Sequence, residues 1–242
     1  MAFTNPRQAR YSGQASFASI THNLNIVEGN LVVAYINRDD STAISSDAGG
    51  SAWTELVQQT PPTGESSSHV VFYKIAGGSE PDTYTWSLNS NRKYQVIVHA
   101  VDTDSEAVVD GFSTGITTAS SVNIVVSAID GEIISDNSIS FVFGGMDRDT
   151  GSGSFDSADN SYTGEIGTSE RRYTASAHRI YTTGTTFSGD VTISSSGTIT
   201  ADKTYSIHVS FVESSGGGSA LLTVGNVNQG QALTTPVLTT NS

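Results

Sequence analysis

The chain has no cysteine, so no disulfide bond can stabilise its fold. It also has no apolar segment as long as a transmembrane helix. The first ten residues lack the apolar run of a signal peptide. No window repeats apolar residues at helical spacing for three turns. These absences predict an all-β protein that has no membrane partner and is made in a cytoplasm.

Positive charge is scarce. Eleven Lys and Arg residues stand against 24 Asp and Glu residues, which gives a formal net charge of −13. A surface of this sign repels phosphate backbones, so we expect no nucleic-acid partner. The same charge keeps a protein soluble and monodisperse, which is the simplest reason for the acidity.

Strand-forming residues are abundant, and they form a pattern that occurs twice. Residues 94–101 are β-branched and aromatic and lie between turn residues, which is typical of a buried strand. Residues 205–212 have the same form, 111 residues later, and an acidic residue follows each copy, Asp102 and Glu213. Four earlier pairs of segments keep the same order with shifts of 108 to 111 residues. The chain therefore contains an internal repeat.

A repeat of this size allows two architectures: two small domains, or two halves that share one core. Each half holds about 75 ordered residues, which is near the lower limit for an independent core. We therefore favour a single pseudo-symmetric antiparallel β-sandwich, jelly-roll-like, over residues 14–213. Its two halves are predicted at 14–104 and 118–213.

The segments outside the sandwich read as arms. Residues 1–13 are polar and irregular, and their only charges are Arg7 and Arg10, so they form either a frayed terminus or a basic arm that lies on a neighbouring subunit. Residues 214–219 read as a flexible Gly/Ser linker, and 220–242 read as a docking tail. The predicted partner-docking residues of the arms are Arg7, Arg10, Leu221, Leu222, Val224, Val237 and Leu238.

Motifs for catalysis are not convincing in this chain. Residues 111–115 match the G-x-S-x-G elbow, but that motif needs a strand-to-helix turn, and no helical pattern follows Gly115. No two of the five histidines have the spacing of a metal site, and His69 and His178 align in the repeat, which favours packing. We expect no catalytic residue and no enzymatic activity.

One acidic loop resembles the start of a calcium site. Residues 147–151 begin like an EF-hand loop, but Ala158 stands where the bidentate Glu would be needed. A solvated turn is the expected state of this loop, and no cofactor is predicted. The alternative is an irregular Ca²⁺ cage, whose candidate ligands are Asp147, Asp149, Asp156 and Asp159.

The order of motifs in the first half resembles a known class of proteins. An apolar strand ends in Arg38-Asp39, and a Gly-rich loop, residues 53–56 (Trp-Thr-Glu-Leu), an aromatic strand and a Gly/Pro turn follow. This order resembles bacteriophage structural β-sandwich proteins of the jelly-roll or lectin-like kind, over residues 30–104 and, less fully, 138–213. The tail looks like one unit of a short repeat found in phage appendage and virion proteins.

The resemblance implies a virion component and brings no catalytic residues with it. We expect a structural protein that decorates or cements a phage capsid, with the sandwich outside and the arms on the lattice. Its implied partners are the major capsid protein or other virion subunits, and a homo-oligomer such as a trimer. The alternative is a carbohydrate- or receptor-binding module of a tail fibre or adhesin, which would show an exposed aromatic platform or a calcium-held loop.

Overall fold

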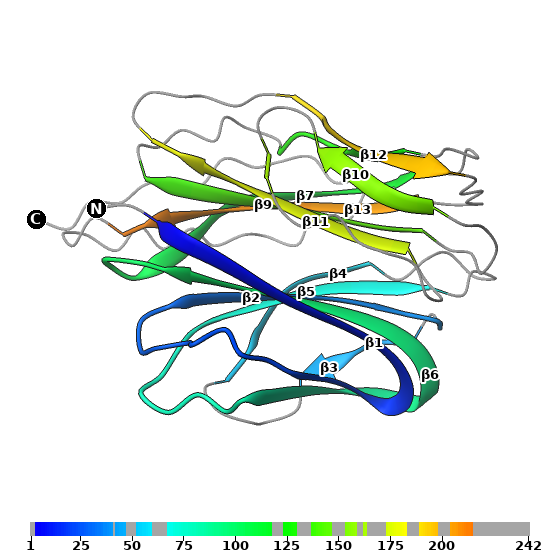
Figure 1. The fold of residues 1–242 in the computed structure, drawn as a ribbon, viewed down its shortest axis with the longest axis horizontal. Helices are drawn as coiled ribbons and strands as arrows, with labels where there is room; N and C mark the ends of the chain where they lie inside the picture. The colour runs from blue at the N-terminus through cyan, green and yellow to red at the C-terminus, as the bar shows by residue number, and fades with distance from the viewer. Residues whose placement is uncertain are drawn as a thin grey trace, which may run out of the picture.

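A computed structural model gives the fold of the chain (Figure 1). It describes residues 3–40, 42–46, 52–59, 67–117, 123–129, 137–146, 153–158, 162–163, 173–182, 189–197 and 204–214. These residues form strands, turns and bends, and no described residue is helical. The strands are β1 (Thr4–Thr21), β2 (Leu31–Arg38), β3 (Ser45–Ser46), β4 (Thr54–Gln59), β5 (Ser68–Ile75), β6 (Thr83–Asp102), β7 (Ala107–Thr117), β8 (Ile124–Val126), β9 (Ser138–Met146), β10 (Gly153–Ala158), β11 (Tyr173–Tyr181), β12 (Val191–Gly197) and β13 (Thr204–Glu213).

Two antiparallel sheets carry the fold, and they repeat one strand order. The first sheet runs β1-β6-β2-β5-β4, and β3 also pairs with β6. The second sheet runs β7-β13-β9-β11, and Thr163 forms an isolated bridge to β11 where β4 would stand. Strands β1–β6, here called the first half, thus have counterparts among strands β7–β13, here called the second half. The predicted all-β, antiparallel sandwich is confirmed at this level.

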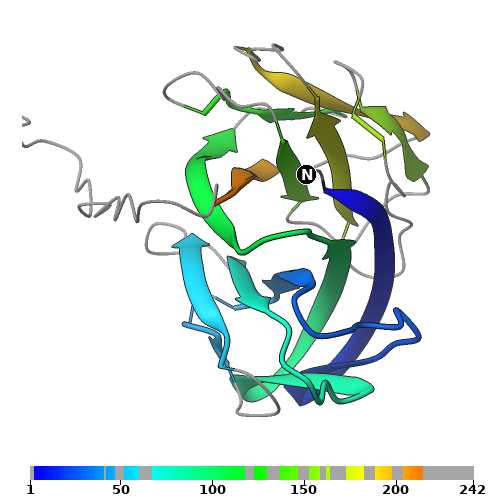
Figure 2. The ribbon, with the colours of Figure 1, turned by 90° about the vertical axis from the view of Figure 1, so that its left-hand side faces the viewer.

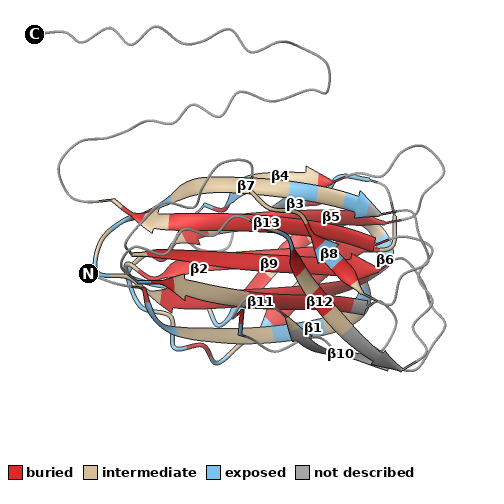
Figure 3. Cartoon of the chain, turned by 90° about the horizontal axis from the view of Figure 1, so that it is seen from above, coloured by how far each residue is buried: buried red, intermediate tan, exposed pale blue. Residues whose placement is uncertain are grey.

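The two sheets face each other across a shared core. Strands β2 and β9 lie at its centre, where the Tyr35 and Phe143 rings stack with centroids 5.1 Å apart. Figure 3 shows β2, β9 and β13 buried along almost their whole length. Strand β2 is apolar from Leu31 to Ile36, and it is buried along its whole length because both of its faces are covered. The buried apolar residues of the shared core are Phe3, Leu31, Val33, Tyr35, Val71, Ile97, Val101, Ala107, Ile139, Phe141, Phe143, Ile207, Val209 and Phe211.

Each half also has a core of its own on its outer face. Strand β6 bends after Leu88, and its first part runs back along the outside of the first sheet with the end of β1 (Figure 1). Trp86 from this outer ribbon packs with Ala34 and Val98 of the sheet beneath. In the second half, β8 and β12 form the matching ribbon, and Ile193 packs with Val142. The described residues therefore form a core in each half and a third core between the halves.

The predicted alignment of residues 94–101, in β6, with residues 205–212, in β13, is wrong by one residue. Val33 pairs with His99, and its counterpart Phe141 pairs with Val209, so the counterpart of Val209 is His99 rather than Val98. A slip of one residue moves a side chain to the other face of a sheet. Val98 accordingly lies in the first-half core, and Val209 lies in the shared core. The sequence alignment pairs Val96 with Ile207 and Val98 with Val209. All four side chains are buried, but the two members of each pair lie on different faces of their sheets.

Three segments differ from the sequence expectation. Residues 4–13 are not an irregular arm, because they belong to β1 and pair with β6. Residues 107–117, expected in the connection between halves, form the outer strand β7, so the second half begins at Ala107 instead of residue 118. Part of the expected loop 146–160 forms β10. Jelly-roll connectivity stays a prediction, and residues 215–242 lie outside the described part of the chain.

Candidate functional site

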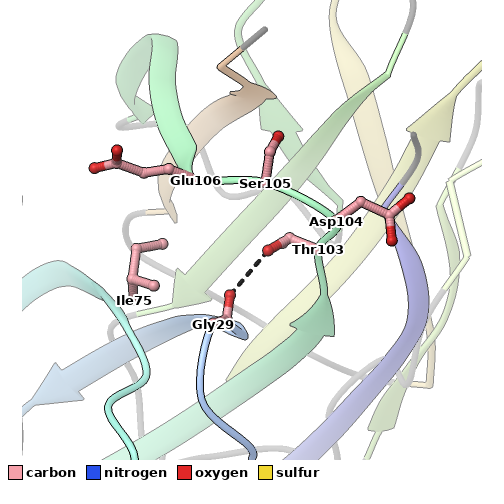
Figure 4. A pocket seen from close by; sticks show the side chains of 6 residues that line it. All are labelled: Gly29, Ile75, Thr103, Asp104, Ser105 and Glu106. Carbon is pink, nitrogen blue, oxygen red and sulfur yellow. Dashed lines mark hydrogen bonds between the residues drawn. The ribbon is translucent and has the colours of Figure 1, made fainter. Parts of the chain in front are cut away.

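Residues 103–106 join the two halves and are called the linker from here on; they are distinct from the Gly/Ser segment 214–219. The linker crosses one end of the sandwich, here called the linker pole. The pole comprises Phe3–Thr4, Gly29–Asn30, Thr103–Glu106 and Glu213–Ser214. A shallow open pocket of about 360 Å³ lies there, between the turn at Gly29, the end of β5 at Ile75 and the linker (Figure 4). Asp104 and Glu106 contribute acidic side chains to the lining of this pocket.

Three hydrogen bonds hold the pole together. The Thr103 hydroxyl donates to the Gly29 carbonyl at 2.8 Å, which Figure 4 draws as a dashed line. The Asp104 backbone N–H donates to Glu213 Oε1 at 2.8 Å. The Ser214 N–H donates to the Glu106 carbonyl at 2.8 Å. The linker is thus tied to a turn of the first half and to the end of the last strand of the second half.

The turn that holds Thr103 depends on its local sequence. Gly29 has φ +89°, in the left-handed region that glycine adopts without a steric penalty. The next residue, Asn30, is buried, and its side-chain oxygen accepts the Val27 N–H at 3.1 Å. Its amide nitrogen donates to Asp102 Oδ1 at 3.1 Å. Asn30 therefore joins the turn to the end of β6.

Arg7 completes this polar cluster from β1. Its Nη2 donates to Asp102 Oδ1 at 2.8 Å and to Asn30 Oδ1 at 2.9 Å, and Asn5 donates to Asp102 Oδ2 at 3.1 Å. Partial burial alone would raise the pKa of Asp102, but the hydrogen bonds from Arg7 and Asn5 and the charge of Arg7 outweigh it, so this pKa is lowered. The cluster therefore stays ionised and fixes the start of β1 to the pole.

The rim of the pole remains acidic. Asp104 and Glu106 are exposed, and Figure 4 shows their carboxylates on opposite sides of the linker. Glu213 is buried, and its Oε2 has no hydrogen-bond partner among the described residues. A buried carboxylate oxygen without a donor is costly. The pole is therefore suited to contact a partner that supplies hydrogen-bond donors or positive charge.

The sequence-predicted docking residues fall in three places. Arg7 lies in the polar cluster of the pole and binds Asp102 of its own chain, so its side chain is not extended toward a neighbouring subunit. Arg10 lies on β1 and is exposed. The tail residues Leu221, Leu222, Val224, Val237 and Leu238 lie outside the described residues.

The calcium candidates are not brought together in the described part of the chain. Asp147, Asp149 and Asp159 lie outside it, and Asp156 lies in β10. Within the residues that the structure places, no group of three or more His, Cys, Asp or Glu side chains could hold a metal ion. The irregular calcium cage stays an untested alternative.

The titratable side chains in the interior have structural partners. His99 is buried, and its Nε2 lies 3.0 Å from the Ser176 hydroxyl across the shared core. Burial, with the nearby His178, lowers the pKa of His99 to about 3. His208 lies 2.8 Å from the Tyr162 hydroxyl, and burial lowers its pKa to about 4. Both imidazoles are neutral at pH 7 and are enclosed, which suits packing better than proton transfer with a substrate.

The residues of the expected Arg-Asp motif and the tryptophans are also structural. Arg38 is buried, and its Nη1 donates to the Leu88 carbonyl at 2.5 Å, where β6 bends. Asp40 lies 3.4 Å from Arg38 Nη2; hydrogen bonds from Thr42 and Arg92 outweigh the effect of its burial and lower its pKa to about 2. Trp53 and Trp86 pack together with ring centroids 5.3 Å apart in the first-half core.

Sequence reasoning did not identify most of the pole. Asn30, Asp102, Thr103 and Glu213 meet only through pairings across the fold. The one available signal was the acidic residue that follows each copy of the repeated strand, because both acids are at the pole.

No helix among the described residues is long and apolar enough to cross a membrane. No protein family, curated protein or solved structure matches this chain.

Proposed function

We propose that this protein is a non-enzymatic structural protein of a bacteriophage virion, which decorates or cements a capsid through segments that leave the linker pole. The observation that carries the proposal is that both ends of the sandwich are at one pole. Thr4 of β1 pairs with Asp102, and Ser214, just after β13, bonds to Glu106. Attachment at this pole leaves the opposite end of the sandwich facing outward.

The sequence beyond the pole is suited to attachment. Residues 215–242 contain no charged side chain, although the chain has a net charge of −13. Their Gly/Ser start separates two short apolar patches from the sandwich. Each buried Leu or Val contributes ~1.5–3 kcal/mol before ordering costs, so several such side chains on many lattice copies give firm attachment. A major capsid protein or another virion subunit is the proposed partner, and the jelly-roll-like, oligomeric state is part of this proposal.

A carbohydrate- or receptor-binding module remains the second candidate because of two aromatic side chains. Tyr11 and Phe17 on β1 are 53% and 50% exposed, and exposed aromatics are a common platform for sugars. Against this, both tryptophans are enclosed in the first-half core. The first candidate is therefore preferred.

The test is electron microscopy of virus particles from the source of this sequence, with and without the protein. The proposal expects regular extra density on the capsid that disappears when the protein is absent. Density at a tail-fibre tip, together with binding to a glycan array, would favour the second candidate. Absence from the particles would contradict both.

A further inference from the structure

Strand β1 is an outer strand of the first sheet, and its pairing with β6 contains a long regular stretch. Among the described strands it pairs only with β6, and it forms one side of the molecule (Figure 2). From Arg7 to Ala15 its register with β6 runs without interruption. A regular outer strand is a template on which another strand can pair. Figure 3 shows β1 mostly half-buried or exposed, unlike the central strands.

The other outer strands carry protection. In β4 the register is interrupted between Glu55 and Val57, and Glu55 places an acid in the strand. In β7 the register is interrupted between Ser210 and Phe211 of its partner, and Asp110 sits at that bulge. Bulges and charges of this kind discourage strand pairing. Strand β1 has register shifts of its own between Thr4 and Arg7 and between Ala15 and Phe17, and the regular stretch from Arg7 to Ala15 contains no Asp, Glu or Pro.

The distribution of acidic residues is compatible with a contact at the same strand. The chain holds 24 Asp and Glu residues, but none of them lies in residues 1–27. Two copies that each carry a net charge of −13 repel one another, and repulsion is smallest where neither contact surface is acidic. Residues 1–27, which expose Tyr11 and Phe17, and the uncharged residues 215–242 meet this condition and are also apolar. Residues 111–129, which include most of β7 and expose Ile116 and Val125, meet it as well.

We propose that residues 220–224 of one copy pair as an added strand with β1 of a second copy, along Tyr11 to Ala15. This proposal rests on the proposed function, in which the tail docks on another chain, and it names the docking site. Main-chain hydrogen bonds supply the attachment, and Tyr11 packs against the apolar side chains of residues 220–224. Phe17 flanks the paired stretch. The contact is head-to-tail, so it builds a closed ring when the rotation between copies closes.

The lengths are compatible with this contact. Residues 215–219 span at most about 18 Å when extended, so the first apolar patch begins close to the linker pole. Five residues in extended conformation match the five from Tyr11 to Ala15, whose register with β6 is regular. The second apolar patch, residues 236–239, remains available for a virion partner.

The test measures the oligomeric state of the full chain by sedimentation. We expect the wild-type chain to assemble, and we expect both the chain truncated after Gly217 and the Tyr11→Glu/Phe17→Glu variant to sediment as monomers. Ile116→Glu on β7 is the matched control, because Ile116 is a similarly exposed apolar residue (41%) on the counterpart strand, and this variant should still assemble. A monomeric wild-type chain, or a Tyr11→Glu/Phe17→Glu variant that assembles as wild type does, would overturn the proposal.

A peptide experiment covers the case in which the double variant fails to fold. A synthetic peptide of residues 219–226 should bind the truncated protein and slow amide exchange from Tyr11 to Ala15, whereas a scrambled peptide should not. Tyr11→Glu alone should weaken peptide binding by about tenfold. Exchange protection on β7 or β4, or no binding, would overturn the site. Binding to virus particles is measured separately from assembly. A chain that assembles with itself but does not bind particles would contradict the proposed function and leave the strand-pairing proposal intact.

Discussion

His69 of β5 stacks on Tyr205 of β13 across the shared core, with ring centroids 4.1 Å apart. The repeat places the pair Thr174 and Gln95 in the same relation, and the Thr174 hydroxyl donates to the Gln95 amide oxygen. His69 lies opposite Asn37 in its sheet, and Thr174 lies opposite Gly145. The sequence alignment paired His69 with His178, but the counterpart of His69 in the structure is Thr174. The two contacts are related by the pseudo-symmetry, although their side chains have diverged.

The first prediction follows from the close approach at Gly145. A Cβ atom there would lie 2.6 Å from His69 Cε1 and 2.8 Å from the Tyr35 hydroxyl, so Gly145→Ala forces a shift of packed groups. Overpacking of this kind costs about 1–3 kcal/mol of the free energy of unfolding. Urea denaturation measures it. Gly78→Ala is the control, because its Cβ would meet only the flexible Glu28 carboxylate; equal stability of the two variants would contradict the account.

The second prediction concerns the buried pair Lys74 and Glu80. Lys74 Nζ is bonded to Glu80 Oε2 and lies 4.4 Å from the centroid of the Tyr84 ring, and both charged side chains are almost fully enclosed. Glu80→Ala leaves a buried ammonium without its partner, which costs about 3–5 kcal/mol. The double variant Lys74→Met/Glu80→Ala should recover more than half of that loss. A double-mutant cycle by chemical denaturation tests this, and strict additivity of the two changes would contradict it.

The third prediction is a loss of stability in mild acid. Burial lowers the pKa of His99 to about 3 and that of His208 to about 4, against about 6.5 in an unfolded chain. Below pH 6.5 the unfolded state binds more protons than the folded state, so stability is full above pH 6.5 and falls as the pH decreases. From pH 7 to pH 5 each histidine accounts for about 2 kcal/mol of the loss.

The control for this pH dependence is His99→Gln, which keeps a polar group near Ser176. Its free energy of unfolding should fall less steeply between pH 7 and pH 5 than that of the wild type. An unchanged slope would mean that His99 is not held neutral by burial.

The fourth prediction concerns the core between the first sheet and its outer ribbon. Val98 is fully buried there, so Val98→Asp places an unpaired carboxylate in an apolar environment and should prevent soluble folding. Val27→Asp makes the same change at a side chain that is 59% exposed, and its stability should stay within about 0.5 kcal/mol of wild type. Solubility and circular dichroism measure both variants. A cooperative, soluble Val98→Asp protein would contradict the packing.

The sequence predicts the central strands well because their residues have to be buried. β2, β5 and β13 are dense in β-branched and aromatic residues, and such runs rarely form other structures. β1 and β7 were not predicted as outer strands, because polar residues and glycines dominate them and their order comes from pairing with β6 and β13. Tertiary pairing decided the structure there.

The sequence predicts the contacts at the linker pole even less well than it predicts the outer strands. The contact between Arg7 and Asp102 joins residues 95 positions apart, and nothing in the local sequence of either residue indicates the other. The sequence alignment of β6 with β13 was wrong by one residue because apolar residues occur on both faces of these strands and hide the slip.

The most direct test of the central claim is binding of the purified protein to virus particles that lack it, measured for the full chain and for the chain truncated after Gly217. The account predicts that both proteins melt at nearly the same temperature, because the sandwich ends at Glu213. It predicts that only the full chain sediments with the particles and appears on the capsid by electron microscopy. Equal binding of the truncated chain, or no binding of the full chain, would contradict attachment through the segment that leaves the linker pole.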